Sequence, residues 1–186
     1  MGSMVDSVQP GGNIQRNSPS RLSRAARAKN RAAFLADAEG SGFIPSASVE
    51  VRFERADARV AQKLAIDEGA EVTVRDRVLR ADGRVVQLSV SRLPRELTRG
   101  TGVEEADTGP GGTYARLEEA GHPPASFVEQ VGARMPTAAE RALLPAGAPV
   151  LTVTRVALKE DGSPLEVNDM VLVADRYQLS YAWLAD

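Results

Sequence analysis

The chain has 186 residues, of which 42% are hydrophobic and 26% charged, and its formal net charge is −2. These totals are typical of one globular domain with a core, or of one domain with a tail. The slightly negative charge argues against the whole chain being a polyanion binder, although it is compatible with a local basic patch. The absence of cysteine excludes a disulfide framework, a thiolate nucleophile and a cysteine-ligated metal.

No apolar run approaches the ~20 residues that a membrane-spanning helix needs. The N-terminus has no apolar stretch that would serve as a secretory signal, and its Met-Gly-Ser followed by a second Met resembles a cloning remnant. We therefore expect a cytoplasmic protein that has no contact with a membrane.

Residues 1–31 differ from the rest in composition. They are rich in Gly, Pro, Ser, Asn and Arg, and their six basic side chains against Asp6 give a net charge of +5. Such a segment buries too little apolar surface to offset its ordering entropy, so we interpret it as a flexible basic linker. Its simplest role is that of a solvated tether, and a contact with DNA phosphates would be non-specific.

From residue 32 onward, hydrophobic periodicity predicts alternating helices and strands. In chain order these are a helix at 32–38, a strand at 47–54, a helix at 58–65, strands at 71–79 and 85–93, a helix at 113–120, a strand at 126–135, a short helix after Thr137, and strands at 150–158, 165–173 and 177–183. Asp82-Gly83 and Asp161-Gly162 are hairpin signals, and Thr137 with Glu140 forms a capping-box motif.

One structural unit is used twice. Residues 69–78 align with 147–156, with Gly, Ala, Val, Arg and Val at matching positions, so that Arg77 falls opposite Arg155. With one inserted residue in the second turn, Gln87 falls opposite Glu166 and Ser89 opposite Asn168. Two such helix–strand–hairpin–strand units predict an α+β fold: an antiparallel sheet of about six strands with flanking helices on one face and an internal pseudo-duplication.

Polar side chains recur at matching positions of this repeat. Because side chains alternate across a strand, Arg75 and Arg77 point the same way, as do Gln87, Ser89 and Ser91. They are either exposed cross-strand pairs or the lining of a pseudo-symmetric cleft. Their duplication favours the cleft.

Catalytic motifs are lacking. His122 is the single histidine, which excludes a histidine-rich metal site and leaves no convincing catalytic triad. Gly109–Gly112 is not followed by the Lys-Ser/Thr of a phosphate loop, although it delivers backbone N–H groups to a helix start, where anions are favoured. We therefore expect neither an enzyme nor a bound metal or cofactor.

From about Ala32 to its C-terminus, the chain resembles the UTRA ligand-sensing domain of GntR-type transcription regulators of the HutC subfamily. The resemblance rests on the order and spacing of short segments. These are 78–83, 87–91 with Leu93-Pro94, 112–118, 153–156, 162–166 and 175–177. It implies a fold similar to chorismate lyase, a pocket for a small-molecule effector, and a homodimer. It also implies that operator DNA is bound through a preceding winged helix-turn-helix domain, which residues 1–31 do not contain.

On this basis residues 32–186 form a UTRA-like effector-binding domain. We expect its dimer contact in the C-terminal half, because Met170–Val173 and Tyr181–Leu184 are apolar and need covering.

The resemblance also suggests ligand-binding residues. Phe34 matches the family's aromatic at the start of the domain, and Arg77, Ser91, Tyr114 and Glu166 match positions around the pocket. The predicted set, completed by the repeat, is Phe34, Arg77, Gln87, Ser91, Arg92, Tyr114, Glu166 and Asn168.

Several family positions carry other residues. Leu79 stands where many members have a second arginine, Gln87 where a glutamate is common, Arg92 where a tyrosine is frequent, and Gly112 where a serine is frequent. These departures disfavour a phosphosugar and point to a less charged ligand, or to an anion held by Arg77 and helix N–H groups. The alternatives are a small chorismate lyase-like enzyme that uses Arg77 and Glu166, or a dimerisation module without a ligand.

Overall fold

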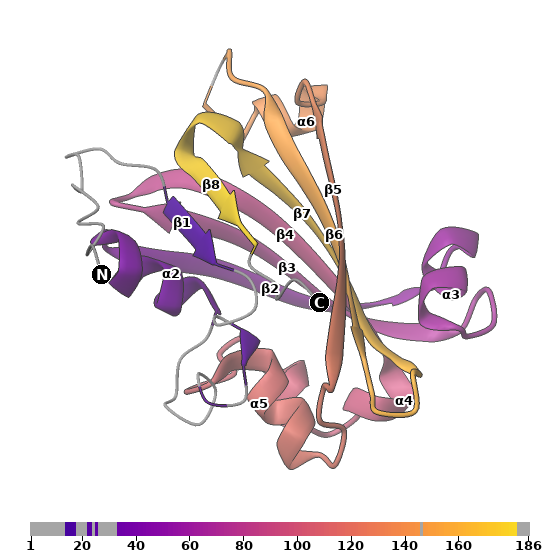
Figure 1. Cartoon of the computed structure of the whole chain (residues 1–186). Helices are drawn as coiled ribbons and strands as arrows, with labels where there is room; N and C mark the ends of the chain where they lie inside the picture. The colour runs from indigo at the N-terminus through magenta and orange to yellow at the C-terminus, as the bar shows by residue number, and fades with distance from the viewer. Residues whose placement is uncertain (1–13, 18–21, 24, 26–32, 146, 182–186) are drawn as a thin grey trace, which may run out of the picture.

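The computed structural model describes residues 14–17, 22, 23, 25, 33–145 and 147–181. Within them, six antiparallel strands form one twisted sheet in the order β2-β3-β4-β7-β6-β5 (Figure 1). The strands are β2 (Pro45–Arg55), β3 (Glu71–Ala81), β4 (Arg84–Pro94), β5 (Ser126–Arg134), β6 (Val150–Leu158) and β7 (Pro164–Val173). The predicted α+β fold with an antiparallel sheet is confirmed.

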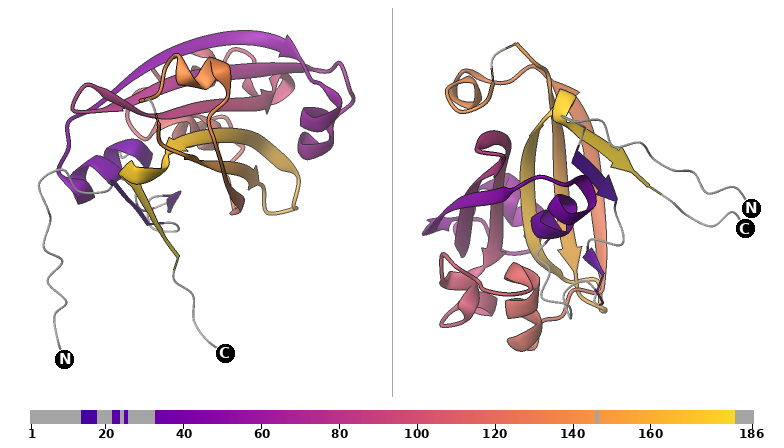
Figure 2. Two further views of the ribbon diagram at one scale, coloured as in Figure 1. Left: turned by 90° about the horizontal axis from the view of Figure 1, so that it is seen from above. Right: turned by 90° about the vertical axis from the view of Figure 1, so that its left-hand side faces the viewer.

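Shorter elements surround the sheet. The helices are α2 (Ala33–Ser41), α3 (Ala58–Leu64), α4 (Arg95–Thr98), α5 (Gly112–Glu119) and α6 (Ala138–Arg141), with 3-10 turns η2 (Gly102–Glu104) and η3 (Ala174–Arg176). A separate pair of parallel strands consists of β1 (Ile14–Asn17) and β8 (Tyr177–Ser180), which lie side by side in both views of Figure 2.

The sheet consists of two equivalent three-stranded halves that meet at β4 and β7. Arg77 pairs with Ser89 in the first hairpin as Arg155 pairs with Asn168 in the second. The register of each hairpin shifts at the same place, after Leu79 in one and after Ala157 in the other. Each half also has an outer strand, β2 or β5, so the repeated unit is strand–helix–strand–hairpin–strand.

Local sequence signals explain where these elements begin and end. Asp82 and Gly83 both adopt positive φ, at 50° and 77°, as the turn of a tight hairpin requires. The Asp57 side chain accepts a hydrogen bond from the Val60 backbone N–H at the start of α3, at 2.7 Å. The predicted capping box of Thr137 and Glu140 is present at α6.

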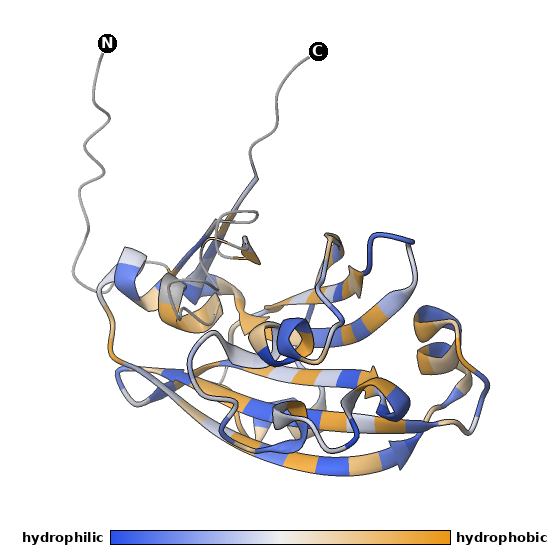
Figure 3. Ribbon diagram, turned by 90° about the horizontal axis from the view of Figure 1, so that it is seen from below, coloured by the Kyte–Doolittle hydropathy of each residue, from blue (hydrophilic) through white to orange (hydrophobic). Residues whose placement is uncertain are grey.

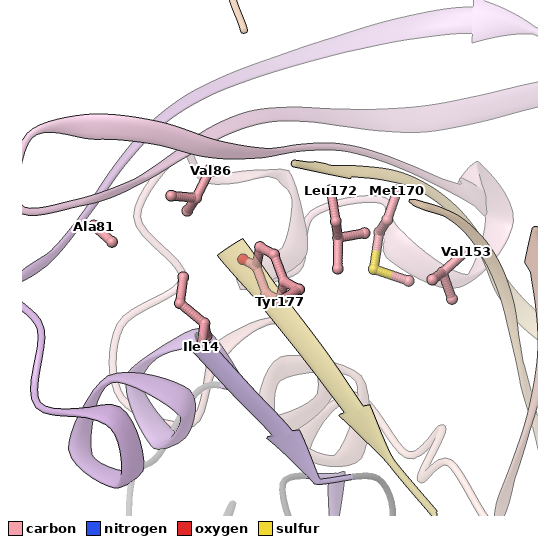
Figure 4. Packing of buried hydrophobic residues seen from close by; sticks show 7 residues of the cluster. All are labelled: Ile14, Ala81, Val86, Val153, Met170, Leu172 and Tyr177. Atoms are coloured by element: carbon pink, nitrogen blue, oxygen red, sulfur yellow. The ribbon is translucent and has the colours of Figure 1, made fainter. Parts of the chain in front are cut away.

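The two faces of the sheet are covered by different elements. We call the face that carries Arg77 and Arg155 the inner face. The β1–β8 pair and α2 pack on it around Met170 and Leu172 (Figure 4), and α5 packs on it through Leu117. The opposite, outer face carries α3, which packs against β3 and β7. The contacting residues on the outer face are Val72, Val74 and Val167, opposite Val60 and Leu64 of α3.

Helices therefore cover both faces, and the expectation that they lie on one face is wrong. Hydrophobic and hydrophilic residues alternate along the strands in Figure 3, and the packed clusters place apolar side chains on both faces of the sheet. An apolar patch on the outer face needs its own cover, which α3 supplies.

The N-terminal segment contains an ordered strand. Ile14 is 1% exposed and belongs to the inner-face core, and the side chain of Arg16 is buried against Glu129. For Ile14–Asn17 the interpretation of residues 1–31 as a flexible linker is therefore wrong, because these residues find an apolar partner surface and a carboxylate. Most of the remaining segment lies outside the described residues.

The apolar surface expected to form the dimer contact is largely covered within the chain. β7 lies between β4 and β6, and Met170, Leu172 and Val173 are buried. Tyr181 is 44% exposed, and Trp183 lies outside the described residues. The expectation that Met170–Val173 needs covering by a partner is therefore wrong.

A buried arginine fixes the loop before α5. Arg75 of β3 is 2% exposed and donates hydrogen bonds to the backbone carbonyls of Val103, at 2.6 Å, of Ala106, at 2.9 Å, and of Glu105. Burial, together with repulsion from Arg77, lowers the pKa of Arg75 to about 10. This contact sets where α5 begins, and hence where Tyr114 lies.

We predict that Leu64→Ala lowers the free energy of unfolding by about 2–5 kcal/mol, because it leaves a cavity between α3 and the outer face. Leu143→Ala is the control, since Leu143 is 52% exposed and its truncation should change little. Urea denaturation of both variants checks this. Equal losses for the two variants would contradict the packing described for α3.

We predict that Arg75→Met costs about 1–3 kcal/mol, because it removes the donor that three loop carbonyls share. Amide hydrogen exchange should become faster in residues 102–112 and stay unchanged in β6. Arg99→Met is the control, because the Arg99 side chain is 66% exposed. Unchanged exchange in the loop of the Arg75 variant would show that Arg75 does not fix it.

Candidate functional site

A row of polar side chains crosses the centre of the inner face. The Arg77 guanidinium on β3 donates to the Ser89 hydroxyl at 3.0 Å and to the Ser91 hydroxyl on β4. The Ser89 hydroxyl donates to the Asn168 side-chain oxygen on β7 at 2.9 Å, and Asn168 pairs in register with Arg155 on β6. The strand register thus brings together polar residues that are far apart in the sequence.

Arg77 is the charged side chain of this row. Among the described residues it makes no ion pair, and its Nε atom has no hydrogen-bond partner. Burial lowers the pKa of Arg77, while the negative charge of Glu166 opposes this effect. By exposed area, Arg77 is less deeply buried than Arg75 and Arg155 on the same face. A guanidinium that contacts two hydroxyls and no carboxylate is suited to bind an anion.

α5 adds a phenol and closes one side of the site. The helix follows Gly111, whose positive φ of 82° lets the chain turn sharply before Gly112. The Tyr114 hydroxyl donates a hydrogen bond to the Glu166 carboxylate, and its ring lies 5.2 Å from that of Phe127. Burial and the Glu166 charge raise the pKa of Tyr114, which keeps its hydroxyl protonated as a donor.

The second half of the duplicated sheet presents a different environment. Arg155 is the repeat equivalent of Arg77, but it donates to the Glu129 carboxylate on β5 at 2.8 and 2.6 Å. Burial alone would raise the pKa of Glu129, but Arg155 and Arg16 lower it to about 2. The residue opposite Arg77 on the matching strand β2 is Val49. The chain thus supplies a counter-ion to Arg155 and leaves Arg77 without one.

The structure groups most of the predicted site residues in this region. Arg77 and Ser91 are in contact, Asn168 joins them through Ser89, and the Tyr114–Glu166 pair acts electrostatically on Arg77.

Two predicted residues lie in the apolar core instead. Gln87 is buried and accepts a hydrogen bond from the Tyr177 hydroxyl at 3.1 Å. Phe34 of α2 packs against Phe43, at 5.3 Å between ring centroids, and against the inner-face core.

Arg92 lies on the outer face and is not part of the candidate site. It is next to Ser91 in the sequence, and adjacent strand residues point to opposite faces. It contacts the carboxylates of Asp169 and Glu54, at 3.3 and 3.9 Å.

Sequence reasoning missed Arg16 and Glu129. It also did not predict that Arg75 would bind the loop carbonyls. The repeat marked Arg155 but did not indicate its partner. Arg16 gave no signal, because it lies in a segment rich in Gly, Pro and Ser.

No other chemistry is evident in the part of the chain that the structure describes. No group of three or more His, Cys, Asp or Glu side chains is placed to hold a metal ion there. No helix in the same residues is long and apolar enough to span a bilayer. A separate surface hollow of about 480 Å³ lies between α3, β3 and α4, and its two arginines, Arg95 and Arg99, are paired with Glu71.

Comparisons with known proteins agree on one family. Residues 45–178 match the UTRA domain. The chain is 30% identical over 157 residues to an uncharacterised HTH-type transcriptional regulator of Streptomyces coelicolor, covering 80% of this chain and 58% of the relative. It is 32% identical over 123 residues to the HTH-type transcriptional repressor PhnF of Mycolicibacterium smegmatis, covering 65% and 50%. The chain spans about half the length of these curated relatives.

Solved structures show the same likeness. The effector domain of PhnF from Mycobacterium smegmatis superposes with a TM-score of 0.71 at 25% identity, covering 82% of this chain and 94% of that one. A putative GntR-family transcriptional regulator superposes with a TM-score of 0.73 at 25% identity, covering 97% and 68%. Because the family match extends over more than half of its length, the chain belongs to the UTRA domain family.

Proposed function

We propose that this chain is the effector-binding part of a bacterial GntR-type transcription regulator of the HutC subfamily. In this proposal a small molecule binds on the inner face of the sheet and shifts the DNA affinity of an N-terminal winged helix-turn-helix domain. The chain's relatives are HTH-type regulators about twice as long as the matched region, which supports the proposal. They also favour a non-enzymatic, cytoplasmic protein over a lyase that would use Arg77 and Glu166.

The observation that carries this proposal is the half-buried Arg77 side chain, whose guanidinium contacts two hydroxyls and no carboxylate among the described residues. The expected effector carries an anionic group that binds Arg77 and Ser91. Its remaining polar groups would meet the Glu166 carboxylate and the Asn168 amide, which together offer donors and acceptors. One free guanidinium suits a ligand with a single anionic group.

We predict that inorganic phosphate, as a minimal anion, stabilises the protein in a thermal-shift titration. Arg77→Met should weaken phosphate binding by about 2 kcal/mol, the typical value of a charged hydrogen bond. The matched control is Arg92→Met, which removes an arginine from the outer face and should leave binding unchanged. Phosphate binding that is equally weak in both variants, or unaffected in the Arg77 variant, would refute this site.

Two further variants distinguish the halves of the sheet. Arg155→Ala should affect stability more than binding, because Arg155 already has a counter-ion in Glu129. Glu166→Gln should weaken the natural effector, once native mass spectrometry of gently purified protein has identified it, while the fold stays largely intact. If Arg155→Ala alone abolished binding, the ligand site would lie in the half of the sheet that holds Arg155 and not in the half that holds Arg77.

We further propose a homodimer that forms through the β5 edge of the sheet. Among the described residues, both β2 and β5 lie at an edge of the sheet, but β2 carries exposed charges such as Glu50 and Arg55, which protect an edge from pairing. β5 instead exposes Val128 and Val131, at 51% and 47%.

Light scattering at micromolar concentration should therefore give a dimer, and Val128→Lys with Val131→Lys should give a monomer. A wild-type monomer, or a dimer that survives both substitutions, would contradict the placement at β5.

A further inference from the structure

The N-terminal strand enters the half of the sheet that holds Arg155. The Arg16 side chain on β1 is fully buried, and its guanidinium lies 2.6 Å from the Glu129 carboxylate. Arg155 binds the same carboxylate oxygen at 2.6 Å, and the Tyr181 hydroxyl donates to the other oxygen at 3.2 Å. Glu129 thus joins the sheet, the N-terminal strand and the residue that follows β8.

The two halves of the duplicated sheet differ at the position opposite their equivalent arginines. Glu129 pairs in register with Arg155, whereas Val49 pairs in register with Arg77. A carboxylate beside Arg155 turns that half from a site for an anion into a site for a second guanidinium. Arg16 is that second guanidinium.

Short-range pairing alone does not hold the N-terminal strand in place. β1 has four residues and pairs with β8, which also has four, and an isolated two-stranded pair of this size is marginally stable. Its attachment also uses Ile14 in the apolar core, Arg16 at Glu129, and hydrogen bonds from Gln15 to Ser41 and Gln178.

We propose that the Arg155 half of the sheet is a docking site for an arginine-bearing extended segment, occupied by Ile14–Asn17, and that an anion bound at Arg77 strengthens this docking. The second clause rests on the proposed function. Arg77 and Arg155 repel one another, and Arg155 shares the Glu129 carboxylate with Arg16. An anion at Arg77 lowers the positive potential at Arg155 and Arg16, and this favours the docked Arg16.

Thermodynamic linkage makes the effect reciprocal, so a docked strand also strengthens anion binding. Residues 14–17 lie ahead of the matched domain, and the curated relatives are longer than the region that matches. Docking of this strand is therefore a physical route by which an occupied pocket affects whatever precedes it.

The first test uses amide hydrogen exchange on the full chain without ligand. Arg16→Met should speed exchange in residues 14–17 and 177–180 about tenfold or more, because a charged hydrogen bond is lost locally. The β6–β7 hairpin should keep its protection, since Glu129 retains Arg155. Arg134→Met is the control, because Arg134 lies on the same strand as Glu129 but forms an exposed pair with Glu140 of α6. Unchanged exchange in residues 14–17, or a uniform increase throughout the domain, would overturn the docking proposal.

The second test adds inorganic phosphate. Phosphate should slow exchange in residues 14–17 of the wild type and have no effect on them in Arg77→Met, and Arg16→Met should weaken phosphate binding. If phosphate binds without slowing exchange there, the coupling is wrong. If phosphate does not bind, the proposed anion site fails, whereas the result for Arg16→Met still decides whether Glu129 holds the strand.

Discussion

The arrangement of buried charge on the inner face underlies the rest of the structure. Burying a guanidinium is costly unless hydrogen-bond partners and an opposite charge compensate it. The chain meets this requirement in three ways. Arg75 donates hydrogen bonds to three backbone carbonyls, and Arg155 and Arg16 share the Glu129 carboxylate. Arg77 donates hydrogen bonds to two hydroxyls and contacts no carboxylate among the described residues. Arg77 is therefore the least compensated of these arginines, and by exposed area it is also the least deeply buried.

Gene duplication offers a simple origin for this difference. Two copies of one unit place arginines at equivalent positions on either side of the β4–β7 pair. One of the differences between the outer strands, Val49 in one copy and Glu129 in the other, gives the two arginines different partners. In the proposed account, one half suits a ligand and the other suits a segment of the protein itself.

The sequence predicted the features that depend on local interactions. The Asp82-Gly83 turn, the Asp57 cap and the Thr137 capping box lie where expected, because each depends on a few adjacent residues. The repeat predicted that Arg77 and Ser89 correspond to Arg155 and Asn168, and the matched pairs of the two hairpins confirm this.

Features that depend on distant contacts were not predictable in the same way. The pairing of Arg155 with Glu129 requires the register of an edge strand, which no local signal specifies. The burial of Arg16 requires β8, more than 150 residues away in the sequence. Arg92 is a different case, because the family resemblance suggested it whereas simple strand alternation places it opposite Ser91.

The central claim is that the inner face binds an anionic group at Arg77. The most direct measurement is a crystal structure of the protein soaked in selenate, an oxyanion whose anomalous scattering locates it unambiguously. The account predicts an anomalous peak within hydrogen-bonding distance of the Arg77 guanidinium and the Ser91 hydroxyl, and no peak there in crystals of Arg77→Met. Peaks confined to exposed arginines of the outer face, with none beside Arg77, would contradict it.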